Sequence, residues 1–571
     1  MAQSFGPPAI TLTPSPRSRV ERGLRAALRP TWGLLVALGL VVVVAAPVAH
    51  VFAFVLRPTE GLWAHLVDTL LIEYLQNTAL LGVGVACATI ILGTGCAWLV
   101  VMCEFPGRRW LDWALVLPLA MPTYVLAYAY TDFLQFTGPV QGLIRELTGW
   151  GWQDYWFPPI HSAGGAILVL SMALYPYVYV LARAAFLDQS VCALEVSRTL
   201  GCTPWGAFLR VGLPLARPAI ATGAGFVVME TLADFGAVKY FELATFTTGI
   251  YRAWFAYGNP AAAAQLASLL LLSVFAVLLL ERWSRGRRQY VHTSARYREL
   301  RAMPLKGIRA AAATMSCVLP LAFGFAIPAV VLLTMASNSS EPIALSRLAH
   351  LIGNTIEIGA LASLLAVGAA LLAVYALKHD GRPLCQGLMR VAVLGYATPG
   401  VVIAVGILIA VGAFDAAIDG AARWLFGVST GLVLASTIAA VLYGCVARFF
   451  AVAFSPLDAG LARVKRSFED VARTLGTSPG SILARIHLPL MRGSVLSALL
   501  LVFVEVLKEL PATMILRPFN FDTLAVEAFQ LATTERLDAA AVPALIIVAV
   551  GLIPVLVLCR TIRRSRPGSA G

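Results

Sequence analysis

The sequence predicts an all-α membrane protein of about twelve transmembrane helices, arranged as two parallel halves of six. Of the 571 residues, 59% are hydrophobic and 13% are charged, and the mean hydropathy of +0.80 is too high for a soluble domain. Several apolar runs exceed the roughly eighteen residues that a helix needs to cross a bilayer, and they lack the period of two that β-barrel strands require. A polar segment that occurs twice indicates an internal duplication.

The apolar runs predict six spans in each half. The expected spans of the first half are 32–56, 77–102, 110–134, 163–186, 217–238 and 262–281. Those of the second half are 308–334, 353–377, 388–412, 429–452, 493–515 and 539–559. The first run is too long for a signal peptide and lacks a clear cleavage site, so we expect a retained anchor. Pro118, Pro122 and Pro399 predict kinks in the third and ninth spans.

The net charge of +13 follows the positive-inside rule and does not indicate a nucleic-acid partner. Arginines crowd residues 17–29, 282–301 and 560–566, and all of these fall on one side of the membrane when the spans are drawn. We therefore expect both chain termini in the cytoplasm. The predicted parts are a basic tail (1–31), a first half (32–281), a basic linker (282–307) and a second half (308–571).

The duplicated polar segment lies near 187–216 in the first half and near 458–492 in the second. Its two copies read EVSRTLGCTPWGAFLRVGLP and DVARTLGTSPGSILARIHLP. In both, an acid stands six residues before a glycine, and a proline follows that glycine by thirteen residues. The matching pairs are Glu195 with Asp470, Gly201 with Gly476, and Pro214 with Pro489.

Each copy reads as a helix, a glycine turn and a second helix on the cytoplasmic side. The acid suits the first turn of a helix, and the glycine tolerates the left-handed conformation where that helix ends. Thr203 and Ser478 each precede a proline, which is a start signal for the second helix. The alternative is a plain connection between spans, but it does not explain why these residues keep their spacing in both copies.

Two pairs of acids inside predicted spans match between the halves, Glu230 with Asp234 and Glu505 with Glu509. Members of a pair are four residues apart and share a helix face, and a carboxylate at membrane depth needs a cavity or a partner. One hypothesis is a translocation pathway for a cation near the pseudo-twofold axis. The alternative is structural pairing with Lys508, Lys239, a helix end or backbone groups. Tyr175, Tyr177 and Tyr179 do not share a helix face, so we interpret them as packing residues.

The P-loop of nucleotide-binding proteins and the zinc-protease motif are missing from the sequence. It contains no Gly-Lys dipeptide and therefore no P-loop. It also contains no H-E-x-x-H or EF-hand pattern, and its nine cysteines include no C-x-x-C pair. We expect neither an enzyme, nor a cofactor, nor a stable metal site, so any ATP hydrolysis belongs to a separate subunit.

The duplicated segment resembles the EAA loop of ATP-binding-cassette importer permeases, E-A-A, three residues, Gly, nine residues, I-x-L-P. The sequence departs from it at Asp470, where the family has Glu, and at Val196-Ser197, where it has Ala-Ala. The resemblance implies the type I permease fold and two copies of an ATPase subunit bound at the loops. It assigns the ATPase contact to Glu195 and Asp470, and the turn within each loop to Gly201 and Gly476.

Residues 230–268 and 505–532 are similar to the fused ferric-iron permeases of bacteria. This resemblance implies a subunit of the bacterial inner membrane that receives ferric iron from a periplasmic binding protein. The fused thiamine permeases share the same layout, so thiamine or another small solute stays an alternative substrate. A gradient-driven secondary transporter is the alternative from a different class, because its halves are also often duplicated.

Overall fold

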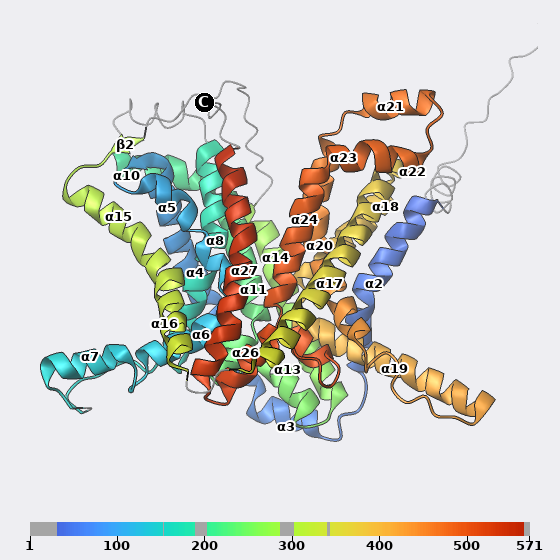
Figure 1. The fold of residues 1–571 in the computed structure, drawn as a ribbon, viewed down its shortest axis with the longest axis horizontal. Coiled ribbons are helices and arrows are strands. Elements are labelled where there is room, and N and C mark those ends of the chain that lie inside the picture. Colours follow the sequence, from blue (N-terminus) through green and yellow to red (C-terminus); the bar gives the residue numbers. More distant parts are fainter. Residues whose placement is uncertain (1–30, 152, 189–202, 286–301, 340–342, 565–571) are drawn as a thin grey trace, which may run out of the picture.

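The computed structural model describes residues 31–151, 153–188, 203–285, 302–339 and 343–564. These residues form a helical bundle, and their only strand pairing joins Cys103–Glu104 to Met303–Pro304 (Figure 1). Ten of the described helices are long and apolar enough to cross a membrane, or twelve when each of two bent helix pairs counts as one span. The prediction of an all-α membrane protein with about twelve spans is confirmed.

The elements of the first half follow one another along the chain from the first span to the basic linker. They are α2 (Trp32–Phe54), α3 (Leu62–Thr69), α4 (Leu71–Met102), β1 (Cys103–Glu104), α5 (Arg108–Ala114), η1 (Leu117–Ala120), α6 (Thr123–Leu134), α7 (Pro139–Thr148), α8 (Ala163–Asp188), α10 (Pro204–Ala207), η2 (Phe208–Gly212), α11 (Leu213–Ala233), α12 (Gly236–Tyr240), α13 (Phe246–Phe255) and α14 (Pro260–Arg285).

The second half repeats this order after a short strand. Its elements are β2 (Met303–Pro304), α15 (Ile308–Leu321), η3 (Ala322–Ala326), α16 (Ile327–Asn338), α17 (Leu345–His379), α18 (Pro383–Val393), η4 (Leu394–Ala397), α19 (Gly400–Phe426), α20 (Ile438–Ala462), α21 (Arg466–Thr474), α22 (Pro479–Ile482), η5 (Leu483–His487), α23 (Leu488–Leu490), α24 (Arg492–Lys508), α25 (Pro511–Leu516), α26 (Leu524–Thr533) and α27 (Leu537–Arg564).

Several predicted spans are broken in the structure. The expected span 110–134 bends by 95° between Ala120 and Thr123, and the expected span 388–412 is interrupted between Ala397 and Gly400. Both breaks fall at the predicted prolines, because proline lacks the N–H that a helix needs and holds the preceding residue in an extended conformation. The prediction 429–452 was wrong by several residues, since α20 begins only at Ile438.

The duplication extends to matching hydrogen bonds. Asn77 on α4 and Asn354 on α17 each donate a 2.9 Å bond to a backbone carbonyl in the loop that leads to α13 or α26. The next residues, Thr78 and Thr355, each accept a bond from the first N–H of that helix, at 3.4 and 2.9 Å. The same two side chains therefore tie the same two elements together in both halves.

The first span of each half packs against the opposite half. Helix α2 lies against α17, α18 and α19, and the pair α15–α16 lies against α4, α5 and α6, while α16 also packs against α27 of its own half (Figure 1). Tyr443 donates a 2.8 Å bond to the Val43 carbonyl of α2, and Gly406 of α19 lies so close to Pro47 that no side chain would fit between them. On the other side, Tyr130 donates to the carbonyl of Phe323. We call α2 and α15–α16 the exchanged helices.

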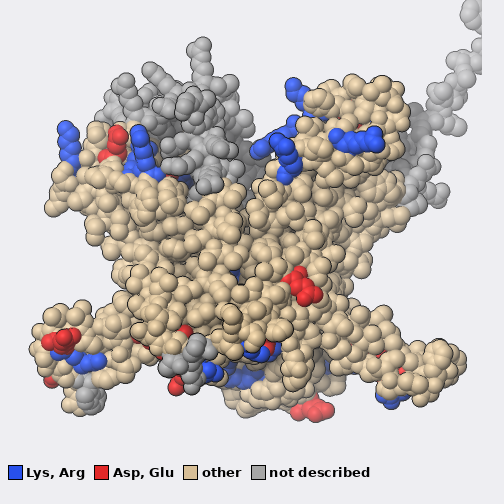
Figure 2. All heavy atoms as spheres, in the orientation of Figure 1, with Lys and Arg blue, Asp and Glu red and all other residues tan. Residues whose placement is uncertain are grey.

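The bundle has two unlike ends. We call the end that carries α10 and α21 the loop end, and the end that carries α3, α13 and α26 the arm end (Figure 1). Helix α7 and the distal part of α19 extend sideways near the arm end. Large aromatic side chains are exposed there, among them Trp156 in the segment after α7 and Trp424 on α19. Lys and Arg side chains gather over the loop end, and the surface between the ends carries few charges (Figure 2), as a membrane-embedded belt requires.

Candidate functional site

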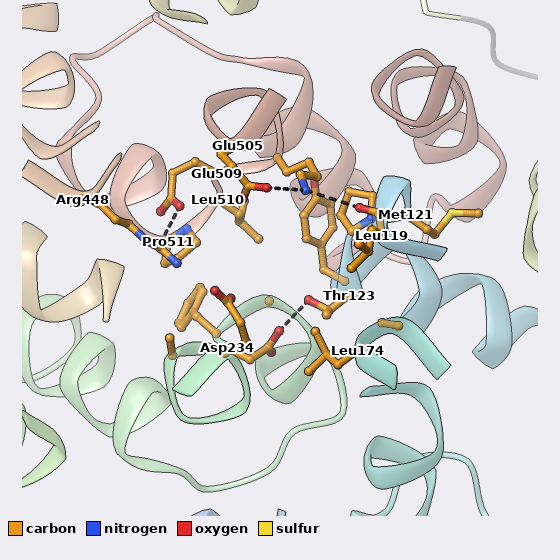
Figure 3. Close-up of a pocket in the computed structure, with 18 of the residues that line it drawn as sticks. Leu119, Met121, Thr123, Leu174, Asp234, Arg448, Glu505, Glu509, Leu510 and Pro511 are labelled. Atoms are coloured by element: carbon orange, nitrogen blue, oxygen red, sulfur yellow. Dashed lines mark hydrogen bonds and ion pairs between the residues drawn. The ribbon is translucent and has the colours of Figure 1, made fainter. Parts of the chain in front are cut away.

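A cavity of about 120 Å³ lies between the two halves and contains all four acids predicted for the pathway. The first half contributes residues of η1, α6, α8 and α11, and the second half contributes residues of α20, α24 and α25 (Figure 3). Glu230, Asp234, Glu505 and Glu509 all line it, so the structure brings the two predicted pairs together near the axis.

Asp234 and Glu509 cap helices. The expected spans 217–238 and 493–515 end early, because these two acids have extended backbones and close α11 and α24. Asp234 accepts hydrogen bonds from the backbone N–H groups of Ala237 and Val238 at 3.0 and 3.2 Å, and from the Thr123 hydroxyl at 2.5 Å. Glu509 accepts a 2.9 Å bond from the N–H of Ala512. Each acid thus satisfies donors at the start of the next short helix.

Glu509 also forms a buried ion pair. Its second oxygen lies 2.5 Å from Nη1 of Arg448, and the two side chains are only 4% and 10% exposed. Arg448 comes from α20 and stands 5.5 Å from the centre of the Phe449 ring. The sequence analysis missed this arginine, although a charged residue inside an apolar span is itself a signal of a polar site.

Glu230 and Glu505 are held more loosely. Glu230 accepts a 2.9 Å bond from the hydroxyl of Tyr396, which belongs to the opposite half. Glu505 lies 3.1 Å from Lys508, and that ammonium also donates a 3.4 Å bond to the Leu119 carbonyl of the first half (Figure 3). Two polar contacts therefore cross the axis between the halves. Lys239, the other predicted partner, is exposed on α12.

The cavity is acidic. Its lining contains four carboxylates against the two cations Arg448 and Lys508, which leaves a formal charge of −2 when all six groups are ionised. Within the part of the chain that the structure describes, no group of three or more His, Cys, Asp and Glu side chains is arranged to hold a metal ion.

Tyrosines complete the lining. Tyr175 and Tyr179 are fully buried, as packing residues should be, but Tyr177 lines the cavity, contrary to the packing interpretation. Tyr124 also lines the cavity, and its hydroxyl is buried without a hydrogen-bond partner among the described residues. No sequence pattern distinguishes Tyr124 from the other fifteen tyrosines.

The loop of the second half has the local structure that its sequence predicts. Helix α21 ends at Thr474, and Gly476 follows in the left-handed conformation with φ of 75°. The Ser478 hydroxyl then accepts a 3.4 Å bond from the N–H of Ser481, and α22 begins at Pro479. Before Pro489 the helix widens into a π-helical turn, because this proline offers no N–H to the carbonyl of the preceding turn.

The loop of the first half is described only in part. Glu195 and Gly201 lie outside the described residues. From Thr203 onward it matches its copy: the Thr203 hydroxyl accepts a 3.1 Å bond from the Gly206 N–H, and a π-helical turn at 208–212 precedes Pro214.

Glu469, which the sequence analysis did not select, attaches α21 to the bundle. Its carboxylate lies 2.8 Å from Lys378 at the end of α17 and 2.6 Å from Arg473, and 3.9 Å from the buried His487. Burial raises the pKa of Glu469, but the hydrogen bond and charge of Lys378, with help from Arg473 and His487, lower it more, so the pKa lies below its usual value. The neighbouring Asp470 is exposed.

A duplicated helical bundle with a polar cavity on its axis and matched loops at one end defines a membrane permease built from two homologous halves. Comparison with known proteins agrees. The family described as "Binding-protein-dependent transport system inner membrane component" matches residues 89–289 and again 362–566. The chain belongs to this family, which implies a substrate-binding protein and an ATP-binding-cassette ATPase as partners.

Relatives of known substrate cover one or both halves. The chain is 26% identical to the Fe(3+)-transport system permease protein FbpB 2 of Haemophilus influenzae, over 91% of this chain and 97% of that protein. It is 30% identical to the molybdenum transport system permease protein ModB of Escherichia coli, over 33% and 81% of the two chains. It is also 30% identical to the putative 2-aminoethylphosphonate permease PhnV of Salmonella typhimurium, over 45% and 96%. The resemblance to permeases of importers, and to a fused ferric-iron permease, is confirmed.

Proposed function

We propose that this permease moves ferric iron, received from a periplasmic binding protein, across the bacterial inner membrane into the cytoplasm. The observation that carries the proposal is the acidic cavity on the axis, with four carboxylates against two cations. Negative charge at low dielectric attracts a cation and repels an oxyanion. Such a lining disfavours oxyanions such as molybdate, and it disfavours the phosphonate group of 2-aminoethylphosphonate, the substrate in the name of one relative.

The size of the cavity supports a small ion over an organic cation such as thiamine. A water molecule needs about 10–15 Å³ of such volume, so 120 Å³ holds on the order of ten water molecules. That space suits a metal ion with part of its hydration shell. Iron is also the substrate named for the relative that covers both halves of the chain.

Two loops imply two copies of the ATPase subunit. Phe468 and Val471 on α21 and Leu475 at its C-terminal cap have apolar side chains that are 52%, 59% and 78% exposed, and their spacing places them on one side of the helix. Asp470 is exposed beside them. We assign this face to the ATPase contact in the second half, and Glu195 with Gly201 to the same role in the first. The loop end is then cytoplasmic, with both chain termini, in agreement with its positive charge (Figure 2).

The coupling role is tested by replacing both loop glycines, Gly201→Val with Gly476→Val. A β-branched residue cannot adopt the left-handed turn without strain, so we expect uptake driven by ATP to be lost while membrane insertion is retained. The matched control is Gly149→Val, because Gly149 ends α7 with φ of 70° but lies on a sideways arm. Uptake that survives in the loop variant contradicts the assignment.

The substrate is tested in cells that lack this gene, with and without the gene restored. We expect labelled ferric iron uptake to return with the gene, and labelled thiamine and molybdate uptake to stay unchanged. Recovery of thiamine or molybdate alone contradicts the iron assignment. Uptake that continues without the ATPase and stops when the proton gradient is dissipated supports the secondary transporter instead.

A further inference from the structure

Two arms extend sideways from the bundle near the arm end, one from each half (Figure 1). The first arm is α7 with the segment that returns from it to α8. The second arm is α19 from Phe414 onward with the segment that returns from it to α20. Each arm follows one of the two matched breaks, at Pro122 and at Pro399, so the arms correspond to one another in the duplication. They point away from each other and from the axis between the halves (Figure 1).

The polar side chains of the first arm are turned toward its own return segment. The amide of Gln141 donates a 2.8 Å bond to the Leu134 carbonyl and accepts a 2.9 Å bond from the Tyr155 hydroxyl. Arg145, one turn further along α7, donates to the same hydroxyl at 3.1 Å and to the Phe136 carbonyl at 2.9 Å. These groups therefore find their partners within the arm and at its root.

The second arm repeats this arrangement with carboxylates. Asp415 accepts bonds of 2.9 and 3.0 Å from the backbone N–H groups of Leu434 and Ala435 in the return segment. Asp419 accepts a 2.8 Å bond from the N–H of Thr430 in the same segment. The two carboxylates are four residues apart and share a face of α19, so the return segment covers the polar face of this arm as well.

The opposite face of each arm is apolar and open. On α7, Leu143 and Leu147 lie one turn apart and are 55% and 76% exposed. On α19, Phe414, Trp424 and Leu425 are 51%, 84% and 60% exposed. Helical spacing places both sets on the side away from the polar residues that bind the return segments. Each return segment runs on the side of its arm that is away from the loop end, so the open faces are turned toward the belt with few charges (Figures 1 and 2).

We propose that both arms lie in the outer interface of the bilayer, with their apolar faces against the lipid acyl chains and their polar faces toward water. A helix with one apolar and one polar side binds in this way, with its apolar side about 5–10 Å into the boundary between headgroups and chains. Trp424 suits this depth, because tryptophan is enriched where membrane meets water. The inference goes beyond the proposed function, since it holds whichever solute the permease carries.

Two observations favour lipid over a periplasmic binding protein as the partner of these faces. Helix α19 runs without a break from the interior of the bundle at Gly400 to Phe426, so the second arm is the direct continuation of a membrane-embedded helix. The arms also point away from the axis, where a binding protein has to release its substrate (Figure 1). The open faces therefore lie beside the bundle, where acyl chains surround a permease, and their uncharged side chains match that partner.

The test is photocrosslinking in intact cells, where lipids and periplasmic proteins both reach the arms. Benzoylphenylalanine, which bonds to nearby C–H groups on illumination, replaces Leu147 or Trp424 on the open faces. The matched controls carry it at Gln153 and Thr430, which are exposed residues of the two return segments. We expect the purified chain to gain the mass of one phospholipid about fivefold more often at the open faces than at the controls.

A second measurement does not depend on the crosslinker. The twelve tryptophans are compared with the eleven of Trp424→Phe in nanodiscs of lipids brominated near the headgroup or near the chain end. The fluorescence that Trp424 contributes should be quenched about twofold more strongly by the shallow bromines. Adducts with a protein at the open faces, or lipid adducts that are absent there or equally frequent at all four positions, overturn the inference. Lipid adducts at the open faces in a permease that carries no iron leave it standing.

Discussion

Removing the charge of Glu509 tests whether the buried ion pair organises the centre of the molecule. In Glu509→Gln the amide oxygen can still accept the hydrogen bond from Ala512, so the helix cap is kept and only the charge is lost. With an effective dielectric constant of about 20 and roughly 4 Å between the two charge centres, the attraction between Arg448 and Glu509 is about 4 kcal/mol before desolvation is subtracted.

The net effect is smaller than this attraction. Breaking a buried ion pair on one side costs about 3–5 kcal/mol, because it leaves the other charge buried and uncompensated. Glu230 and Glu505 line the same cavity as Arg448 and offset part of that penalty, so we expect a loss near 3 kcal/mol. The double variant Glu509→Gln with Arg448→Met removes both charges, and it should recover most of the lost stability.

The assay is thermal unfolding of the purified chain in nanodiscs, followed by the fluorescence of a dye that reacts with exposed thiols. Glu146→Gln is the control, since Glu146 is an exposed carboxylate on α7 and its loss should leave the melting temperature nearly unchanged. The reasoning from the ion pair is refuted if Glu509→Gln has the same melting temperature as the Glu146→Gln control. It is also refuted if the double variant is less stable than Glu509→Gln.

Two further predictions concern the loop and the duplicated hydrogen bonds. The lowered pKa of Glu469 means that its contacts stabilise the fold above the usual carboxyl pKa of about 4.5, and that this contribution is lost as the pH falls. Melting curves of the wild type and Glu469→Gln should therefore differ at pH 7 and converge in acid; a constant difference contradicts the assignment. Thr355→Val should destabilise the fold by about 1–3 kcal/mol, because a buried N–H loses its acceptor. Thr78→Val, which removes the longer 3.4 Å bond, should cost less in the same melting assay, and the reverse order would contradict the argument.

Much of the fold could be predicted because each membrane-spanning helix requires a long run of apolar residues, which is visible in the hydropathy of the sequence. The loop turn at Gly476 and the breaks at Pro122 and Pro399 were also readable, since proline and glycine act through their own backbone geometry. The spans that end at Asp234 and Glu509 were drawn too long. Hydropathy is averaged over a window of many residues, so a single acid that ends one helix and caps the next does not interrupt the apolar signal.

The sequence allowed the four acids of the site to be predicted, but not the side chains with which they pair. The offset between the halves placed Glu230 opposite Glu505, but the pairing of Glu509 with Arg448 depends on how α20 packs beside α24. Arg448 itself could have been selected, because an arginine in an apolar span demands an explanation. Nothing in the sequence near Tyr124 distinguishes an orphaned hydroxyl from an ordinary core tyrosine, since that difference arises only when distant helices meet.

The exchanged helices have a consequence for how the protein is made. The ribosome produces α2 first, yet α17, α18 and α19, against which it packs, begin only at Leu345. Until then α2 has only α14 among its main packing partners, and it tolerates contact with lipid because only 28% of its apolar window is buried even in the finished fold. If the chain were cut at the linker into two polypeptides, each half would depend on the other polypeptide for the exchanged helix that packs against it. Carrying both halves on one chain supplies them in equal number and at the same place in the membrane.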